Sequence, residues 1–241
     1  MLGEPLLRLE ETDSTNRVAL EWQDAPHGAA VVARSQTQGR GRLGRNWESA
    51  AGKGLYFSLI LRVEVPDAPL YSLSSALGVT SALEKLTKLK CRVKWPNDVL
   101  CVSSDGEARK IGGILCEARG PQLVVGIGVN VNQNLEELPP RPVFPASSLA
   151  LESGKTWEID AVLSAIIREL NVVLPRLENH GWNDLRAEFE NQCLGIGEVL
   201  RVKTGSETLI GTLESVDEKG ALVLRTASGV RKVLAGEISY F

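Results

Sequence analysis

The sequence predicts an α+β protein in which a mixed main domain is followed by a small all-β domain. Up to residue 193, strand-like segments alternate with segments whose apolar residues recur at helical spacing. From about Gly195 only short alternating runs remain, separated by glycine-containing turns, which is typical of a small β-barrel of about five strands. We therefore expect a large main domain over residues 1–193 and a small C-terminal domain over residues 194–241.

The first elements surround a loop rich in glycine and arginine. Residues 6–11 alternate like a short strand, and the Asp-Ser-Thr cluster at 13–15 suits the N-cap of a helix that runs through residue 22. Residues 29–33 predict a strand that leads into the loop, and residues 55–63 predict the strand that leaves it.

A helix and a set of short strands come next. Apolar residues at helical spacing predict a core-facing helix over 70–89. The segments expected to form the following strands are 91–95, 98–102, 109–118 and 122–131. A proline-rich connection over 138–148 then leads to a long amphipathic helix over 159–177.

Composition excludes several classes of protein. The 241 residues are 43% hydrophobic and 24% charged, which are ordinary globular values, and a net charge of −3 argues against a dedicated polyanion binder. Glu4 and Glu10 stand where a signal peptide would be basic, and no apolar stretch approaches the roughly 18 residues of a membrane span, so we expect a cytoplasmic protein. The four cysteines lack CxxC spacing, so neither a zinc site nor a disulfide framework is indicated.

The segment QTQGRGRLGRNW, residues 36–47, concentrates positive charge in an acidic chain. Arginine pairs bidentately with phosphate and carboxylate, and glycine lets the backbone approach a ligand closely. At about 4 Å and an effective dielectric near 20, each opposite-charge contact is worth on the order of 4 kcal/mol before desolvation. The loop therefore suits an anion, although on its own it also fits a solvated or RNA-contacting loop.

The segment VKWPNDVL, residues 93–100, places a cation, an amide and a carboxylate at one stiff corner. Lys94, Asn97 and Asp98 flank the turn that Trp95-Pro96 restricts. The alternative is an ordinary Asx turn, in which Asp98 satisfies local amides and Lys94 is solvated.

Glycines in two adjacent strands predict a bare surface. Gly126 and Gly128 share one face of the expected strand over 122–131, and Gly112 and Gly113 follow Lys110 directly. A bare strand face leaves room for a flat ligand, whereas close sheet packing or a bulge is the alternative.

Together these motifs resemble those of biotin protein ligases. GRGRLGRNW, KWPND, RKIGGIL and GIGVNVN, preceded by DSTN at 13–16, occur in the order and spacing of that family, and the resemblance covers nearly the whole chain. It implies a catalytic domain similar to class II aminoacyl-tRNA synthetases, with a mixed sheet and flanking helices, followed by an SH3-like barrel. It also implies a monofunctional form, because DSTN begins at residue 13 and leaves no room for an N-terminal DNA-binding domain.

The resemblance implies an ATP-dependent ligase that converts biotin to biotinoyl-5'-AMP and transfers it to a lysine of a biotin carboxyl carrier protein. The implied catalytic residues are Arg40, Arg42, Lys110 and Asp98. The implied biotin-binding residues are Ser14, Thr15, Gln36, Gly39, Arg40, Lys110, Gly113 and Gly126. The implied ATP and adenylate residues are Arg42, Arg45, Trp47, Trp95, Asn97 and Asn130. Asp98 is also expected to handle Mg²⁺, through water.

The sequence leaves the loop charge and the oligomeric state open. Leu43 stands where many relatives have another arginine, which lowers the charge of the loop. The protein can be a monomer or a homodimer, and neither a membrane nor DNA is expected as a partner. No tightly bound prosthetic group is implied.

Two rival functions are considered. Lipoate ligases and octanoyltransferases share the implied fold, and the transferases use a lysine with a thioester-forming cysteine, which Cys116 could supply; its apolar setting instead predicts a buried, inert thiol. A non-enzymatic nucleic-acid-binding protein is the rival from another class, and the acidic balance of the chain counts against it.

Overall fold

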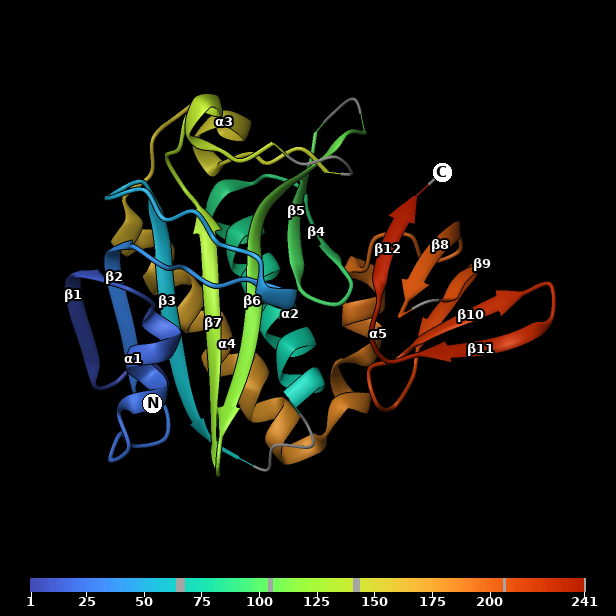
Figure 1. The fold of residues 1–241 in the computed structure, drawn as a ribbon, viewed down its shortest axis with the longest axis horizontal. Helices are drawn as coiled ribbons and strands as arrows, with labels where there is room; N and C mark the ends of the chain where they lie inside the picture. The colour runs from blue at the N-terminus through green and yellow to red at the C-terminus, as the bar shows by residue number, and fades with distance from the viewer. Residues whose placement is uncertain (64–67, 104–105, 141–143, 206, 241) are drawn as a thin grey trace.

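The computed structural model describes residues 1–63, 68–103, 106–140, 144–205 and 207–240. Its main element is a seven-stranded mixed sheet, with strand order β1-β2-β3-β7-β6-β5-β4 (Figure 1). Its strands are β1 (Leu6–Thr12), β2 (Ala30–Gln36), β3 (Gly54–Arg62), β4 (Cys91–Lys94), β5 (Asp98–Val102), β6 (Ala108–Arg119) and β7 (Gln122–Asn130). The β1–β2 pair is parallel, and the other five pairs are antiparallel.

Helices cover the two faces of this sheet unequally. The long helices α2 (Ala68–Thr87) and α4 (Ile159–His180), together with α5 (Trp182–Gln192), pack against one face, and the short helix α1 (Thr15–Glu21) lies on the other (Figure 1). Strand alternation explains the division. In β3, Phe57 and Leu59 join the large core under α2 and α4, whereas Ile60 joins a small cluster under α1. The rest of the α1 face is left for a cavity.

The C-terminal part of the chain forms a separate five-stranded antiparallel sheet with strand order β11-β10-β9-β8-β12. Its strands are β8 (Val199–Thr204), β9 (Glu207–Val216), β10 (Leu222–Thr226), β11 (Gly229–Val233) and β12 (Glu237–Tyr240). The α+β class and the small terminal β unit are confirmed. The domain boundary at 193/194 stays a prediction.

Two indole rings attach the small sheet to the main one. Trp95 Nε1 donates to the carbonyl oxygen of Gly220 at 2.9 Å, and Trp182 Nε1 donates to that of Asp217 at 3.0 Å. Both rings are buried, so each N–H requires such a partner. These bonds hold the loop between β9 and β10 against the helical side of the main sheet.

The structure differs from the sequence expectations in several elements. The helices α3 (Leu149–Ser153) and α5 were not expected, and short 3-10 turns form at Arg42–Gly44 and Leu135–Glu137. The signal for α5 is present as Trp182, Leu185 and Phe189, the three residues that it buries, but the rest of the segment is mostly charged or polar. In the proline-rich connection, residues 141–143 lie outside the described residues.

The start of α1 also differs in detail from the expected N-cap. Ser14 takes the N-cap position, but its side chain makes no capping hydrogen bond. The Thr15 N–H donates instead to Gln36 Oε1 at 2.8 Å, across to the end of β2. The backbone donor is therefore satisfied by tertiary contact, and the buried Ser14 side chain lines the cavity described below.

No helix in the described part of the chain is long and apolar enough to span a membrane.

Candidate active site

One cross-strand row of the main sheet organises the cavity on the α1 face. The register aligns Lys94 of β4 with Asp98 of β5, then Gly113 of β6, Gly128 of β7 and Tyr56 of β3. The row therefore has two charged groups at one end and two side-chain-free positions at its centre.

A bulge brings Lys110 to the same face. Lys110 and Gly113 are three residues apart, so they would point to opposite faces of an unbroken strand. The register with β5 shifts between Val99, opposite Gly112, and Leu100, opposite Lys110, and this irregularity lets both residues line the cavity. A lysine and a bare backbone patch thus become neighbours.

Asp98 stands between two lysines. Lys110 Nζ donates a hydrogen bond to Asp98 Oδ1, and Lys94 Nζ lies 3.8 Å from Asp98 Oδ2. Burial lowers the pKa of Lys94, and the charge of Asp98 opposes that shift. The site therefore holds excess positive charge around one carboxylate.

The glycine–arginine loop, residues 39–47, folds over this charged group. Its ends are joined by the Trp47 N–H, which donates to the Gly39 carbonyl at 2.9 Å, and Leu43 at its apex is exposed with a left-handed φ of 57°. Arg42 Nη1 donates to Asn97 Oδ1 at 3.0 Å, and Asn97 Nδ2 donates to the Ile114 carbonyl at 2.9 Å. The corner at residues 96–98 therefore orients a loop arginine.

Burial also acts on Arg42. Burial lowers the pKa of this guanidinium, while Asp98 and Glu237 raise it. Arginine stays protonated in proteins, so Arg42 is a partly desolvated permanent cation beside the two lysines. Desolvation strengthens the attraction between such a cation and an anion that enters the cavity.

The indole of Trp47 lies on the bare centre of the row. A Cβ added at Gly128 would lie 2.5 Å from Trp47 Cε2, and one added at Gly113 would lie 3.3 Å from Trp47 Cζ3. The expected slot thus exists, and a side chain of the protein itself occupies it. Trp47 Nε1 is buried and has no hydrogen-bond partner among the residues that the structure describes. A buried N–H of this kind offers a donor to a ligand.

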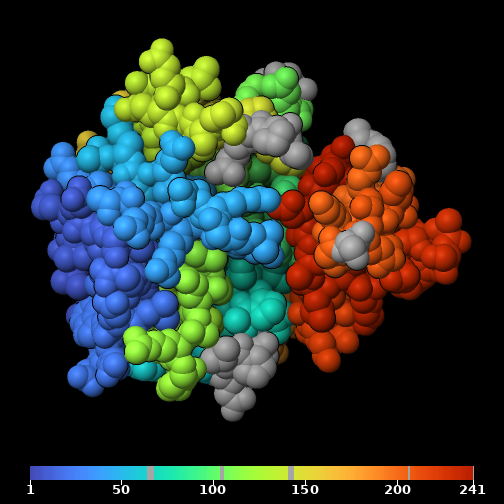
Figure 2. Space-filling model, viewed as in Figure 1, coloured from blue at the N-terminus to red at the C-terminus, as the bar shows by residue number. Residues whose placement is uncertain are grey.

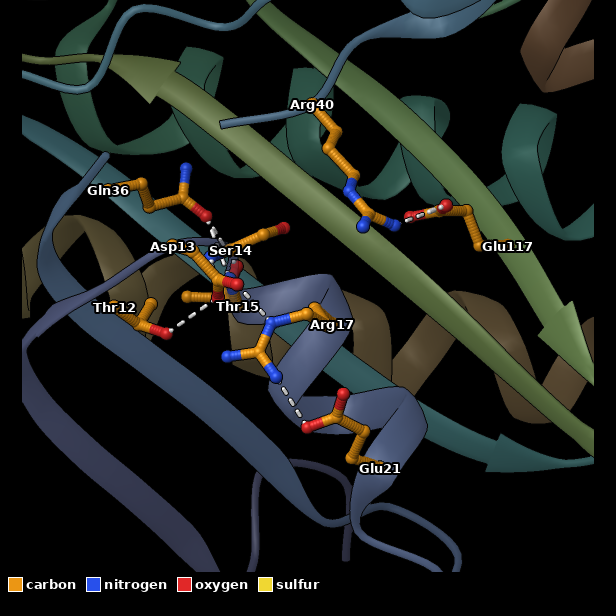
Figure 3. Close-up of polar contacts among 9 residues, drawn as sticks. All are labelled: Thr12, Asp13, Ser14, Thr15, Arg17, Glu21, Gln36, Arg40 and Glu117. Carbon is orange, nitrogen blue, oxygen red and sulfur yellow. Dashed lines mark hydrogen bonds and ion pairs between the residues drawn. The ribbon is translucent and has the colours of Figure 1, made fainter. Parts of the chain in front are cut away.

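The floor of the cavity is a hydrogen-bonded polar group at the start of α1 (Figure 3). Gln36 Oε1 accepts from the Thr15 N–H at 2.8 Å and from Thr15 Oγ1 at 3.1 Å. Ser58 Oγ lies 2.8 Å from Thr15 Oγ1 and 2.7 Å from Asn16 Oδ1. Thr15, Asn16 and Ser58 are all buried, so the floor is rigid as well as polar.

The structure brings most of the expected site residues together. The expected residues that line this one cavity are Ser14, Thr15, Gln36, Arg40, Arg42, Arg45, Trp47, Trp95, Asn97, Asp98, Lys110, Gly113 and Gly126. Gly39 lines a separate recess between the loop and β6, and Asn130 lines a neighbouring recess with Trp47 and Lys110. Trp95 is 1% exposed and its N–H is committed to Gly220, so its indole supports the wall from behind.

Sequence reasoning missed several residues at the site, and three of them are Asn16, Tyr56 and Glu237. Asn16 on the floor is part of the DSTN motif, Tyr56 lies in the cross-strand row, and Glu237 of β12 lines the cavity from the small sheet. The motif could have indicated Asn16. No local pattern indicates Glu237, because its place depends on how the two sheets pack.

Cys116 lies away from this chemistry. It alternates with Leu115 and Glu117 on β6 and packs against the core under α2. Burial raises the pKa of its thiol to about 12. The expectation of an inert thiol agrees with this setting, and the acyltransferase alternative is not favoured.

Comparison with known proteins identifies the family. Residues 8–134 match the biotin/lipoate A/B protein ligase family, and residues 195–240 match the biotin protein ligase C-terminal domain. The chain belongs to the biotin/lipoate A/B protein ligase family. The resemblance expected from the sequence motifs is thereby confirmed.

Relatives within this family cover nearly the whole chain. The biotin–(acetyl-CoA-carboxylase) ligase of Paracoccus denitrificans is 31% identical, with 96% of this chain and 99% of the relative covered. The bifunctional ligase/repressor BirA of Bacillus subtilis is 32% identical, with 99% of this chain but 74% of the relative covered. The biotin protein ligase of Aquifex aeolicus in complex with biotin and ATP has a TM-score of 0.84 and 34% identity, with 98% of each chain covered.

Proposed function

We propose that this member of the ligase family condenses biotin with ATP to form biotinoyl-5'-AMP, and then transfers the biotinoyl group to a lysine of a biotin carboxyl carrier domain. The observation that carries the proposal is the convergence of Arg42, Lys94 and Lys110 beside a cavity with a bare glycine row and a buried polar floor. The relative from Aquifex aeolicus, which is described in complex with biotin and ATP, supports the choice of substrates.

The polar floor suits the ureido ring of biotin. A buried ureido group has two N–H donors and one carbonyl acceptor, and each requires a partner. Ser14, Thr15 and Gln36 place hydroxyl and amide groups on the cavity wall at that end. Gly113 and Gly126 also line the cavity, and their missing side chains make room for the Trp47 indole and the Asn16 amide.

The cationic end suits the reacting groups. The carboxylate of biotin attacks the α-phosphorus of ATP, and both reactants are anions, so their repulsion must be reduced. We assign Arg40 and Arg42 to the carboxylate and phosphate region and Lys110 to oxygens of the acyl phosphate, and the position of all three in the cavity lining supports this assignment. Pyrophosphate then leaves, and the bond from biotin to AMP forms without a covalent enzyme intermediate.

The second step requires protection more than catalysis. The amine of the acceptor lysine attacks the biotinoyl carbonyl, and AMP leaves. Because the mixed anhydride reacts with water, the loop at residues 39–47 must stay closed between the two steps. Arg45, Trp47, Asn97 and Asn130 stand where they can hold the nucleotide end.

The residues present also fit a sparsely held Mg²⁺. Asp98 is a carboxylate at the cationic end, and a Mg²⁺ that keeps most of its waters needs only one or two carboxylates besides phosphate oxygens. Asp98 would hold the ion through water, and the ion would neutralise phosphate charge. A cytoplasmic location belongs to the same proposal.

Mass spectrometry of an acceptor tests the proposal directly. The chain is incubated with biotin, ATP, Mg²⁺ and an acceptor carrier domain, and parallel reactions contain lipoate or octanoate in place of biotin. We expect one biotinoyl group on the acceptor lysine and no modification without ATP. Modification by lipoate but not by biotin would instead support the related acyl-ligase activity.

A further inference from the structure

The carboxylate of Glu117 is held between the floor of the cavity and the glycine–arginine loop. Glu117 Oε2 accepts a hydrogen bond from Asn16 Nδ2 at 2.8 Å, and Glu117 Oε1 pairs with Arg40 Nη1 at 3.1 Å. In Figure 3 the Arg40 side chain extends from the loop toward β6 and meets Glu117 there. One carboxylate thus connects a fixed residue and a loop residue.

Asn16 is the fixed partner in this arrangement. Its side chain is 4% exposed, its Oδ1 lies 2.7 Å from Ser58 Oγ, and its Nδ2 also donates to the Leu115 carbonyl at 3.3 Å. Gly126 is directly beneath it, and any side chain at Gly126 would collide with the Asn16 amide. The sheet therefore determines the position of Asn16, and Asn16 determines that of Glu117.

The pair of Glu117 and Arg40 is too exposed to serve mainly as a source of stability. The two side chains are 27% and 45% exposed, and ion pairs at such positions contribute little to folding. The geometry has a different consequence. Because one oxygen of Glu117 is fixed from below, the other specifies where the Arg40 guanidinium stands above the cavity.

We propose that Glu117 is a positioning residue for Arg40 and thereby determines how well the carboxylate of biotin is captured. This inference rests on the function proposed above. One nitrogen of the Arg40 guanidinium donates to Glu117, and Arg40 also lines the cavity, so its planar group keeps further N–H donors for a ligand there. Substrate contact belongs to Arg40, and Glu117 acts through it.

Substitution at Glu117 is expected to affect biotin more than ATP. In Glu117→Ala the guanidinium loses its orientation, so the KM for biotin should rise by about tenfold, while the KM for ATP changes less than about twofold. Glu117→Gln keeps a single carbonyl acceptor, which can serve Asn16 or Arg40 but not both, and it removes the charge, so it should recover only part of the loss. Calorimetric titration with biotin alone should show the same order of affinities.

A double-mutant cycle separates positioning from a merely structural role. In an Arg40→Ala background, Glu117→Ala should change the KM and the dissociation constant for biotin by less than about twofold, because the group that it orients is gone. If the fold-change of the double variant equals the product of the two single fold-changes, the residues act independently and the inference is overturned. If Glu117→Ala does not fold, the cycle is run with Glu117→Gln, whose fold is checked by thermal unfolding.

Glu21→Gln is the matched control. It removes a carboxylate that pairs with Arg17 at 2.6 Å on the exposed side of α1, and it should leave both constants for biotin unchanged. The wild-type chain keeps the two proposals distinguishable. Absence of biotin transfer by the wild type would contradict the proposed function. Normal transfer by the wild type, together with independent effects of Glu117→Ala and Arg40→Ala, would contradict only the role of Glu117.

Discussion

Arg45 in the glycine–arginine loop forms an ion pair with Glu237 in β12, although 192 residues separate them in the chain. In Figure 2 the light-blue loop crosses the face of the main sheet and reaches the red C-terminal sheet. The small sheet therefore contributes a wall and an anchor to the cavity, and Gly236 and Glu237 line it.

Removing this anchor should loosen the loop with little effect on folding. Both side chains are largely exposed, so Glu237→Gln should cost at most about 1 kcal/mol of stability. Trypsin should cleave the loop faster in the variant, and biotinoyl-AMP should leave it faster. Glu207→Gln, which breaks an ion pair with Arg231 inside the small sheet, is the control. Equal cleavage of both variants would show that the pair does not hold the loop.

The glycine row should respond to a methyl group according to the clearance above it. A Cβ at Gly128 would meet Trp47 at 2.5 Å and one at Gly113 at 3.3 Å, so Gly128→Ala must displace the indole and Gly113→Ala need shift it only slightly. We expect a larger loss of adenylation and a larger change in tryptophan fluorescence for Gly128→Ala. The reverse order would contradict the placement of Trp47.

Lys110→Ala should depress the activation step strongly. Lys110 lines the cavity and pairs with Asp98, so its loss removes a preorganised charge from the reacting centre, an effect of about 10²–10³-fold in kcat. Pyrophosphate exchange measures that step alone. Lys155→Ala is the control. Lys110 lies over the Trp47 ring, 5.5 Å from its centre, and Lys155 likewise lies over the Trp157 ring, 4.3 Å from its centre, but outside the cavity. Near-normal exchange by Lys110→Ala would remove this lysine from the mechanism.

Cys116→Ser should retain ATP-dependent biotin transfer. Burial raises the pKa of the Cys116 thiol to about 12, and its side chain packs toward α2, so neither ionisation nor position suits a thioester role. Transfer rates of the wild type and the variant are compared with the carrier domain as acceptor. Abolished transfer in a normally folded variant would revive the acyltransferase alternative.

The stability contributed by Asp217 should depend on pH. Burial alone would raise the pKa of Asp217, but the Lys232 ammonium and the backbone N–H groups of Lys219 and Ala221 outweigh it, and the pKa is lowered. A lowered pKa gives stability that is fully present above the unfolded value of about 3.9 and is lost as pH falls through the folded value.

We therefore expect Asp217→Asn to be less stable than the wild type by about 1–2 kcal/mol at neutral pH, and this difference should shrink as the pH falls below about 3.9. Chemical denaturation of both proteins across this range measures the difference. Asp160→Asn is the control, because its 71% exposed side chain should contribute little at any pH. A difference that does not vary with pH would contradict the assignment to the Asp217 charge.

Local patterns in the sequence predicted most elements of the main sheet. The bounds of β5, Asp98–Val102, agree with the expectation because a turn limits the strand on its N-terminal side and its residues are strongly β-forming. The helix α5 was missed because charged residues outnumber the three that it buries. The position of α5 against the small sheet depends on tertiary packing.

The site was predicted in its residues but not in its geometry. The resemblance of the motifs predicted that Arg42, Asn97 and Lys110 belong to one site, and in the structure all three line one cavity. The bulge that turns Lys110 to this face and the ion pair of Arg45 with Glu237 both depend on contacts between distant segments of the chain. The spacing of residues within one segment does not indicate such contacts. The same limit hid the link from Asn16 through Glu117 to Arg40.

Because helices α2 and α4 cover only one face of the main sheet, stability and substrate specificity depend largely on different sets of side chains. Under α2 and α4 the strands present Phe57, Leu59 and their neighbours, whereas the reverse side presents glycines and charges. Substitutions that repack the core under α2 and α4 should change the stability of the protein and leave its substrate specificity unchanged. Redesign for another acyl group would be confined to the cavity on the opposite face, beside the small cluster under α1.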